Sequence, residues 1–147
     1  SDLNHASQKG LQTIFDSSVG RSTVNHPLGG RYQITPTEAS VQKLPVQHGV
    51  TTTASVMAQG FNPYVAEWSP YHGAAYAVIE ATARLVAAGA NWSKARFSYQ
   101  EYFERMDKQA ERFGQPVAAL LGSIEAQIQL GLPSIGGKDS MSGTFEE

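Results

Sequence analysis

The feature that most limits the possible folds is a long run of small and apolar residues between Ser69-Pro70 and Gly89. Serine followed by proline is a strong helix start, because the serine side chain caps the first amides and proline fits the first helical position. Residues 71–88 are nearly all small or apolar, and Gly89 suits the left-handed conformation that often ends a helix. The sequence therefore predicts a helix over residues 71–88.

The polar side chains of this helix follow a regular spacing. His72, Tyr76, Glu80 and Arg84 recur every four residues, so they lie along one stripe of the helix. Two interpretations stay open. The stripe is either a narrow solvent-exposed edge that contains a Glu80–Arg84 ion pair, or a row of groups that faces a nucleotide and its metal ion.

The other segments predict a mixture of strands and helices. Residues 49–58 favour a strand, because four β-branched residues stand together and small residues follow them. Residues 98–101 have the capping-box pattern, which predicts a helix that ends at Gly114. Pro116 would start the next helix, and Gly131 would end it.

The last helix carries apolar residues at helical spacing, and the sequence predicts that they form its core face. These residues are Val117, Leu120, Leu121, Ile124 and Ile128. A return strand then leads into Gly136 and Gly137. Strands, then helices, then a return strand indicate an α+β fold, with a mostly antiparallel or mixed sheet and helices packed on one face.

Length and composition restrict the classes of protein. The 147 residues suit one domain, with residues 1–45 as a lead-in segment with edge strands and residues 46–147 as its core. A net charge of −2, with acidic and basic residues interspersed, argues against nucleic acids and anionic membranes as partners. The absence of cysteine excludes disulfides and thiol chemistry, and no apolar run is long enough to span a bilayer. We expect a cytoplasmic protein.

One stretch near the end of the chain has the residue types that bind phosphate. Gly136 and Gly137 allow close approach of the backbone, and Lys138, Asp139 and Ser140 add a cation, an anion and a hydroxyl. A glycine-rich strand end followed by a turn is the alternative interpretation. The stretch is not a Walker A loop, and the chain shows no Ser/His/Asp set, HExxH zinc site or Rossmann fingerprint.

Several motifs resemble one family. Residues 133–142 resemble the GKDSMS motif of the phosphoribosylformylglycinamidine synthase family. Residues 15–20, 51–55 and 90–92 look like the same family in the same order. The resemblance implies an internal AIR-synthetase-like subdomain, with the AIR-synthetase N-terminal type of fold, excised at both ends from a much longer chain. Sister subdomains of the same enzyme would be its partners.

The resemblance also implies a biochemical context. Members of the family are ligases of purine biosynthesis that convert formylglycinamide ribonucleotide, ATP and glutamine to the amidine, ADP, phosphate and glutamate. This piece would be structural or would bind an auxiliary nucleotide, ATP or ADP with Mg²⁺, and would not be active alone. The alternatives are a non-catalytic scaffold or dimerisation module with an empty, degenerate pocket, and a self-contained ATP-binding regulator.

The resemblance further implies which residues meet the nucleotide. The expected phosphate contacts are Gly136, Gly137, Lys138, Asp139, Ser140 and Arg84, and the expected metal ligand is Glu80. His48 and Ser55 stand where the family has acids, and Arg84 stands where it has an asparagine. These departures argue against bound Mg²⁺, because imidazole and hydroxyl groups are poor magnesium ligands. Arg84 could instead pair with a phosphate directly.

A last expectation concerns self-association. The strand expected at residues 50–58 carries small and β-branched side chains on both faces. Domains that resemble this one pack sheet to sheet in pairs, so the resemblance implies a homodimer through this strand when no sister subdomain is present. A monomer that leaves the strand face exposed is the alternative.

Overall fold

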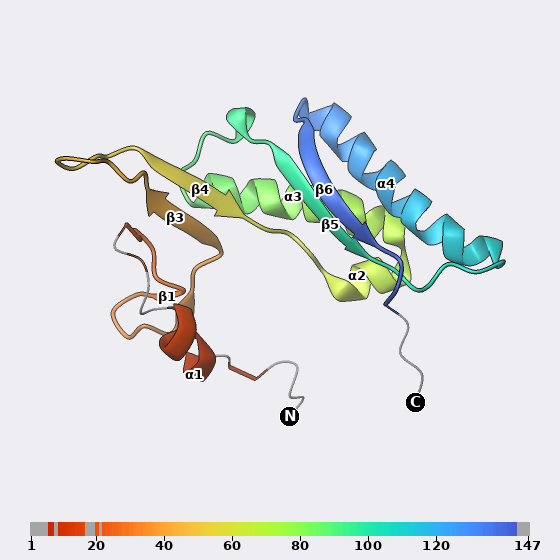
Figure 1. The fold of residues 1–147 in the computed structure, drawn as a ribbon, viewed down its shortest axis with the longest axis horizontal. Coiled ribbons are helices and arrows are strands. Elements are labelled where there is room, and N and C mark those ends of the chain that lie inside the picture. Colours follow the sequence, from red (N-terminus) through yellow and green to blue (C-terminus); the bar gives the residue numbers. More distant parts are fainter. Residues whose placement is uncertain (1–5, 8, 17–19, 21, 144–147) are drawn as a thin grey trace.

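The computed structural model describes residues 6–7, 9–16, 20 and 22–143, and Figure 1 shows its elements along the chain. The α-helices are α1 (Lys9–Leu11), α2 (Pro63–Trp68), α3 (Pro70–Ala87) and α4 (Ala110–Leu130). The strands are β1 (Leu28–Gly29), β2 (Thr35–Pro36), β3 (Ala39–Lys43), β4 (Ala54–Ala58), β5 (Phe97–Tyr102) and β6 (Ser134–Ser140). A π-helical turn, η2 (Gln12–Asp16), follows α1, and a 3-10 turn, η3 (Trp92–Lys94), precedes β5.

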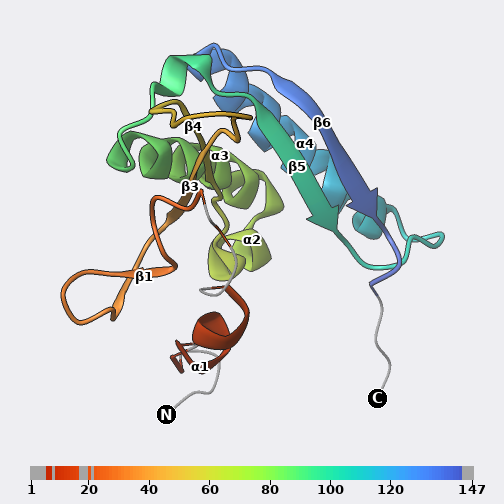
Figure 2. The same ribbon diagram turned by 60° about the vertical axis from the view of Figure 1, so that its left-hand side comes forward.

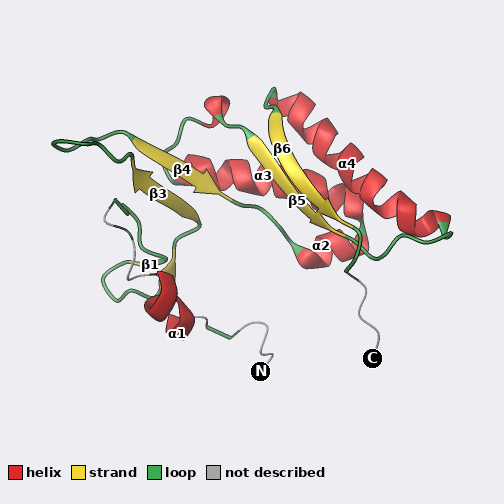
Figure 3. Cartoon of the chain, viewed as in Figure 1, coloured by secondary structure: helices red, strands yellow, loops and turns green. Residues whose placement is uncertain are grey.

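The strands form three small sheets. β1 pairs with β2 and β3 pairs with β4 in antiparallel orientation, whereas β5 and β6 are parallel. α4 connects β5 to β6, and a parallel pair requires such a crossover. Figure 3 shows α3 and α4 on one side of β5 and β6. The α+β class is thus confirmed in broad terms, but within the described residues the expected single sheet is divided into three two-stranded ones.

The beginning of the chain lies apart from the main layer. Figure 2 shows α1 and β1 away from α4, β5 and β6. In this part of the chain, α1 and η2 together cover residues 9–16. The family-like motif at residues 15–20 lies partly outside the described residues. Among the helices that the structure describes, none is long and apolar enough to cross a membrane.

The long helix begins and ends as the sequence predicts. The side chain of Ser69 caps α3 by accepting a hydrogen bond from the amide of His72, and Pro70 is the first helical residue. Gly89, directly after the C-cap, has a φ of +82°, which glycine adopts without strain. The helix is therefore fixed at both ends by local interactions, independently of its packing.

The core lies between α3, α4 and β5. Val78 of α3 is 1% exposed and clusters with Phe97, Ala126 and Leu132. Gly122 of α4 sits directly on the first turn of α3, where an added Cβ would be 2.8 Å from a backbone carbonyl carbon. Glycine at this position lets the two helix backbones approach closely.

The prediction of a helix from the capping-box pattern at residues 98–101 is wrong. These residues belong to β5, where Phe97 is buried and Tyr99 and Glu101 are half-buried, while Ser98 and Gln100 are exposed. This alternation with period two matches a strand that has one covered face. Tertiary packing of Phe97 and Tyr99 against the helices outweighs the local helix signal.

The expected boundary between two helices is also wrong. α4 runs without interruption through Gly114 and Pro116. Its end is as predicted, because Gly131 has a φ of +66° and caps the helix.

The expected core face of α4 is wrong as well. The buried residues are the smaller ones on the opposite side, namely Pro116, Ala119, Gly122, Ser123 and Ala126. The large apolar residues predicted to be core are exposed. Small residues pack against α3 because they permit the close approach of the helices, and this leaves the large ones outside.

The strand expected at residues 49–58 is shorter in the structure. Only its second half forms β4, which pairs with β3 from Ala54 to Ala58. Val50, in the connection before β4, is 97% exposed. The β-branched run thus forms part of an extended hairpin loop.

Candidate functional site

Glu80 and Arg84 stand one helical turn apart on α3 and form an ion pair, with 2.8 Å between Oε1 and Nη2. Nη1 of Arg84 donates to the carbonyl oxygen of Gln59 at 2.7 Å, and Nη2 also pairs with Oε1 of Glu38 at 3.2 Å. The other oxygen of Glu80 accepts the backbone amide of Phe61 at 2.8 Å. Together these contacts hold the segment after β4 against α3.

A glycine makes this arrangement possible. A Cβ added to Gly60 would be 2.7 Å from the amide nitrogen of Ala81 in α3. The chain therefore passes directly over the helix backbone between the two residues that Glu80 and Arg84 hold. The ion pair between Glu80 and Arg84, predicted from the polar stripe, is confirmed. The other two residues of the stripe do not join it: His72 hydrogen-bonds to Ser69, and Tyr76 is exposed.

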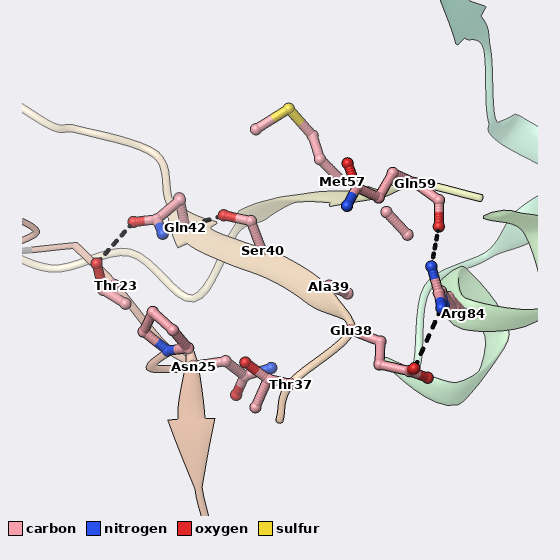
Figure 4. A pocket seen from close by; sticks show the side chains of 12 residues that line it. Thr23, Asn25, Thr37, Glu38, Ala39, Ser40, Gln42, Met57, Gln59 and Arg84 are labelled. Carbon is pink, nitrogen blue, oxygen red and sulfur yellow. Dashed lines mark hydrogen bonds and ion pairs between the residues drawn. The ribbon is translucent and has the colours of Figure 1, made fainter. Parts of the chain in front are cut away.

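A cleft of about 620 Å³ opens beside Arg84, and Figure 4 shows its lining. The lining residues are Thr23, Asn25, Pro27, Thr37, Glu38, Ala39, Ser40, Gln42, Met57, Ala58, Gln59 and Arg84. In Figure 4, Arg84 and Gln59 lie at one end, while Thr23 and Gln42 lie at the other, joined by a hydrogen bond of 3.0 Å. Half of the lining residues carry hydroxyl or amide groups, which suit a polar ligand.

The charges at the cleft are nearly balanced. Glu38 and Arg84 are the charged residues of the lining, and Glu80 adds a second carboxylate behind Arg84. A phosphate would therefore compete with two carboxylates for one guanidinium. Glu38 is the easier of the two to displace, because its side chain is 61% exposed while that of Glu80 is 35% exposed.

The glycine-rich stretch at the end of the chain is a strand. Gly136 to Ser140 pair with residues 98–102 of β5 in parallel register. A Cβ on Gly137 would be 2.7 Å from the carbonyl oxygen of Tyr99, so this glycine serves close strand contact. The glycine-rich strand, part of the alternative interpretation of this stretch, accounts for Gly137, whereas a Cβ on Gly136 would have no atom within 4 Å.

Lys138 and Asp139 occupy opposite faces of the sheet. Successive side chains of a strand point to opposite sides, and the register places Lys138 beside Gln100 and Asp139 beside Glu101. Ser140 shares the face of Lys138. The strand therefore does not direct the expected cation and anion toward one phosphate.

One face of this sheet carries two neighbouring carboxylates, the half-buried Glu101 and the exposed Asp139. Burial, and then the charge of Asp139, raise the pKa of Glu101 above its usual value. Burial, and then the charge of Glu101, raise the pKa of Tyr99 to about 12. One oxygen of Glu101 and the hydroxyl of Tyr99 are buried without a hydrogen-bond partner. The sheet thus carries a carboxyl group that retains its proton more readily than an exposed glutamate.

Glu101 should make stability depend on pH. A raised pKa means that the folded chain binds protons more strongly than the unfolded chain, so stability is highest below the usual glutamate pKa of about 4.3 and falls as pH rises. We expect Glu101→Gln to raise the melting temperature at pH 7. The gain in the free energy of unfolding should be less than about 1 kcal/mol, because the group is partly exposed. Thermal unfolding followed by circular dichroism at pH 4 and pH 7 measures this.

The matched variant for this prediction is Asp139→Asn, which removes the neighbouring charge and should give part of the same gain at pH 7. Neither variant should gain much stability at pH 4, because the raised pKa of Glu101 favours its neutral form there. A gain from Glu101→Gln that is equal at both pH values would contradict the role of the raised pKa.

The residues at the positions where the family resemblance implies metal ligands have other surroundings in this structure. Within the described part of the chain no group of three or more histidine, aspartate or glutamate side chains could hold a metal ion. Both oxygens of Glu80 have partners within the chain, and Ser55 donates to the carbonyl oxygen of Gln42 at 3.4 Å. His48 lies in the exposed connection between β3 and β4.

The sequence-predicted site residues thus fall on two elements. Arg84 and Glu80 lie on α3 beside the cleft, and Gly136, Gly137, Lys138, Asp139 and Ser140 lie on β6. Glu38 and Glu101 were missed. The contact of Glu38 with Arg84 joins residues 46 positions apart, so no local pattern signals it. The alternation of covered and exposed residues around Glu101 was a usable signal, but the capping-box pattern obscured it.

Comparison with known protein families, with curated proteins and with solved structures finds no match to this chain. The functional argument therefore depends on the residues and contacts described above.

Proposed function

We propose that this chain is a structural subdomain, of the AIR-synthetase N-terminal type, of a phosphoribosylformylglycinamidine synthase. Four motifs in the family's order support this assignment, and the α+β architecture is compatible with it. In that setting the chain contributes to an ATP- and glutamine-dependent ligase of the cytoplasm without carrying out the chemistry itself.

The observation that carries the structural role is the set of contacts around Glu80 and Arg84. Both carboxylate oxygens of Glu80 and both terminal nitrogens of Arg84 bind groups of the same chain. These are the positions at which the family resemblance implies a metal ligand and an asparagine. Groups that hold the polypeptide together are not free to bind Mg²⁺ or phosphate without breaking those contacts. A structural use of the old nucleotide position is the simplest account of this geometry.

A second candidate function is auxiliary binding of ATP or ADP in the cleft beside Arg84. The volume of about 620 Å³ falls in the range of small-molecule sites, and the lining is polar. A phosphate could take the place of the exposed Glu38 carboxylate on the guanidinium. Any Mg²⁺ would then be held mainly by the nucleotide's own phosphates, with Glu38 and Glu80 as the carboxylates beside Arg84.

Thermal unfolding with and without nucleotide separates the two functions. A ligand present at one hundred times its Kd stabilises a protein by about 2.7 kcal/mol, which raises the melting temperature by several degrees. We expect 1 mM ATP or ADP, with or without Mg²⁺, to leave the melting temperature unchanged. A rise of several degrees would establish the second function in place of the purely structural role.

Variants then locate any site that this experiment reveals. If Arg84→Lys abolishes the nucleotide-induced rise in melting temperature and Lys138→Ala retains it, the nucleotide binds in the cleft. Loss in Lys138→Ala would place it at β6, where a charge-assisted contact is worth about 1.5–3 kcal/mol. Formation of the amidine by the chain alone, given formylglycinamide ribonucleotide, ATP and free ammonia, would contradict the proposed dependence on other subdomains.

The proposed partners are the sister subdomains of the same enzyme and, in their absence, a second copy of the chain. The first half of the expected strand is highly exposed at Val50, which supports an available surface there. Two copies would meet either through residues 50–58 or through another face of the chain. Val50→Asp distinguishes the two cases, because it should dissociate the dimer only in the first.

A further inference from the structure

The most prominent unexplained surface is the outward side of α4. We call the α4 stripe its six large apolar side chains, Phe113, Val117, Leu120, Leu121, Ile124 and Ile128. Their exposed fractions range from 38% to 74%. They follow the helical repeat along the side opposite to the residues that pack against α3. Scattered exposed apolar residues are ordinary, but six on one helix face form a contiguous patch.

The exposed area is large for a chain of this size. The total accessible surface is 11225 Å², whereas a folded monomer of 15.8 kDa is expected to expose about 7,300 Å². The α4 stripe alone exposes on the order of 500 Å². Two such stripes in contact would bury on the order of 1,000 Å², and the surrounding polar residues would add to this area. The total buried area would then reach the size of a specific interface.

The spacing of the stripe shows what fits it. Its midpoint falls between Leu120 and Leu121, and the other members are placed symmetrically about this point. Phe113 and Ile128 stand equally far from the midpoint, and so do Val117 and Ile124. A two-fold interface joins one surface to an identical one, so it requires a self-complementary pattern. A stripe that reads the same in both directions is self-complementary in antiparallel orientation.

We propose that two copies of this chain associate through the α4 stripe, with the two α4 helices antiparallel. Phe113 of one copy then faces Ile128 of the other, and Val117 faces Ile124. The exposed acids of α4, Glu111 and Glu125, are compatible with this register. No glutamate lies opposite its own copy, and the nearest two are offset by about 7 Å along the helices.

The oligomeric state tests the proposal. Sedimentation equilibrium of the wild-type chain over 1–100 µM should show a dimer, and Leu120→Glu with Leu121→Glu should weaken the association at least tenfold. These side chains are 44% and 55% exposed in the single chain, so the variant should keep the wild-type circular dichroism spectrum. If it does not fold, Ile128→Lys, at a residue that is 74% exposed, takes its place.

Two matched variants identify the surface. Tyr76→Glu alters an exposed aromatic residue of α3 and should leave the dimer intact. Val50→Asp should also leave it intact, because the residue lies in the loop before β4. A wild-type monomer at 100 µM, or a dimer that only Val50→Asp dissociates, would overturn the proposal. Assemblies larger than a dimer would overturn it too, because a two-fold contact closes on itself.

Engineered cysteines test the antiparallel register. The chain has no cysteine of its own, so the double variant Val117→Cys with Ile124→Cys introduces the only thiols. Seven helical residues span about 10.5 Å, which is too far for a disulfide within one helix, so any bond joins two chains. Oxidation should give a covalent dimer with the double variant and much less with either single one.

The control pair is Tyr76→Cys with Ala83→Cys, which has the same spacing on the exposed side of α3 and should not cross-link. Equal cross-linking by Ile124→Cys alone would indicate a parallel arrangement and overturn the antiparallel register. Nucleotide binding enters none of these measurements, so their outcome is independent of the function proposed above.

Discussion

Gly122→Ala is expected to lower the stability of the chain by about 3 kcal/mol, which corresponds to a fall in melting temperature of about 5–12 °C. The added Cβ would collide with the carbonyl group of Tyr71, whose carbon is 2.8 Å away. Both positions belong to helix backbones in the core, so neither atom moves without separating α3 from α4. Chemical denaturation followed by circular dichroism measures the loss.

The same helix supplies the control for this prediction. Gly114 has no atom within 4 Å of an added Cβ. Gly114→Ala should therefore raise stability by about 0.5–1 kcal/mol, because alanine favours the helix. If both variants gain stability, the close approach of α3 and α4 at Gly122 is not present in solution.

Arg84→Ala is expected to lower stability by about 2 kcal/mol. The substitution removes a hydrogen bond to the carbonyl oxygen of Gln59 and leaves the carboxylates of Glu38 and Glu80 without their shared cation. Arg84→Lys should recover only part of the loss, because an ammonium group does not reproduce the planar arrangement of donors. Thermal and urea unfolding of the three proteins measure the series.

Arg112 is a matched control, because it also pairs with two acids, Glu104 at 3.1 Å and Asp107 at 2.8 Å. Those partners are close in sequence, and the pairs join no distant segments. Arg112→Ala should therefore cost less than about 1 kcal/mol. Equal losses in Arg84→Ala and Arg112→Ala would show that the contacts of Arg84 with the segment after β4 contribute little.

The parts of the fold that depend on local chemistry could be predicted from the sequence. The cap at Ser69, the proline at the first turn and the glycines after α3 and α4 act within a few residues, so the sequence shows them directly. The ion pair of Glu80 and Arg84 belongs to the same class, because the partners are one helical turn apart.

The parts that depend on distant contacts could not be predicted. The pattern at residues 98–101 suits a helix cap, but β5 forms because Phe97 packs between two helices. The buried face of α4 was predicted from hydrophobicity. In the structure, small residues such as Gly122 and Ala126 are buried instead, because they let α3 and α4 approach closely. The cleft could not be predicted either, because its lining residues, such as Thr23, Glu38 and Arg84, are far apart in the sequence.

The parallel pairing of β5 and β6 has a consequence for synthesis of the chain. β5 pairs with no described strand except β6, which is joined to it through the whole of α4. While a ribosome is still making α4, the backbone amides and carbonyls of β5 have no partner strand to bind. An unpaired strand edge is the kind of surface that joins other chains. The interval between the emergence of β5 and the emergence of β6 from the ribosome is therefore a period in which this strand edge is open to misassembly.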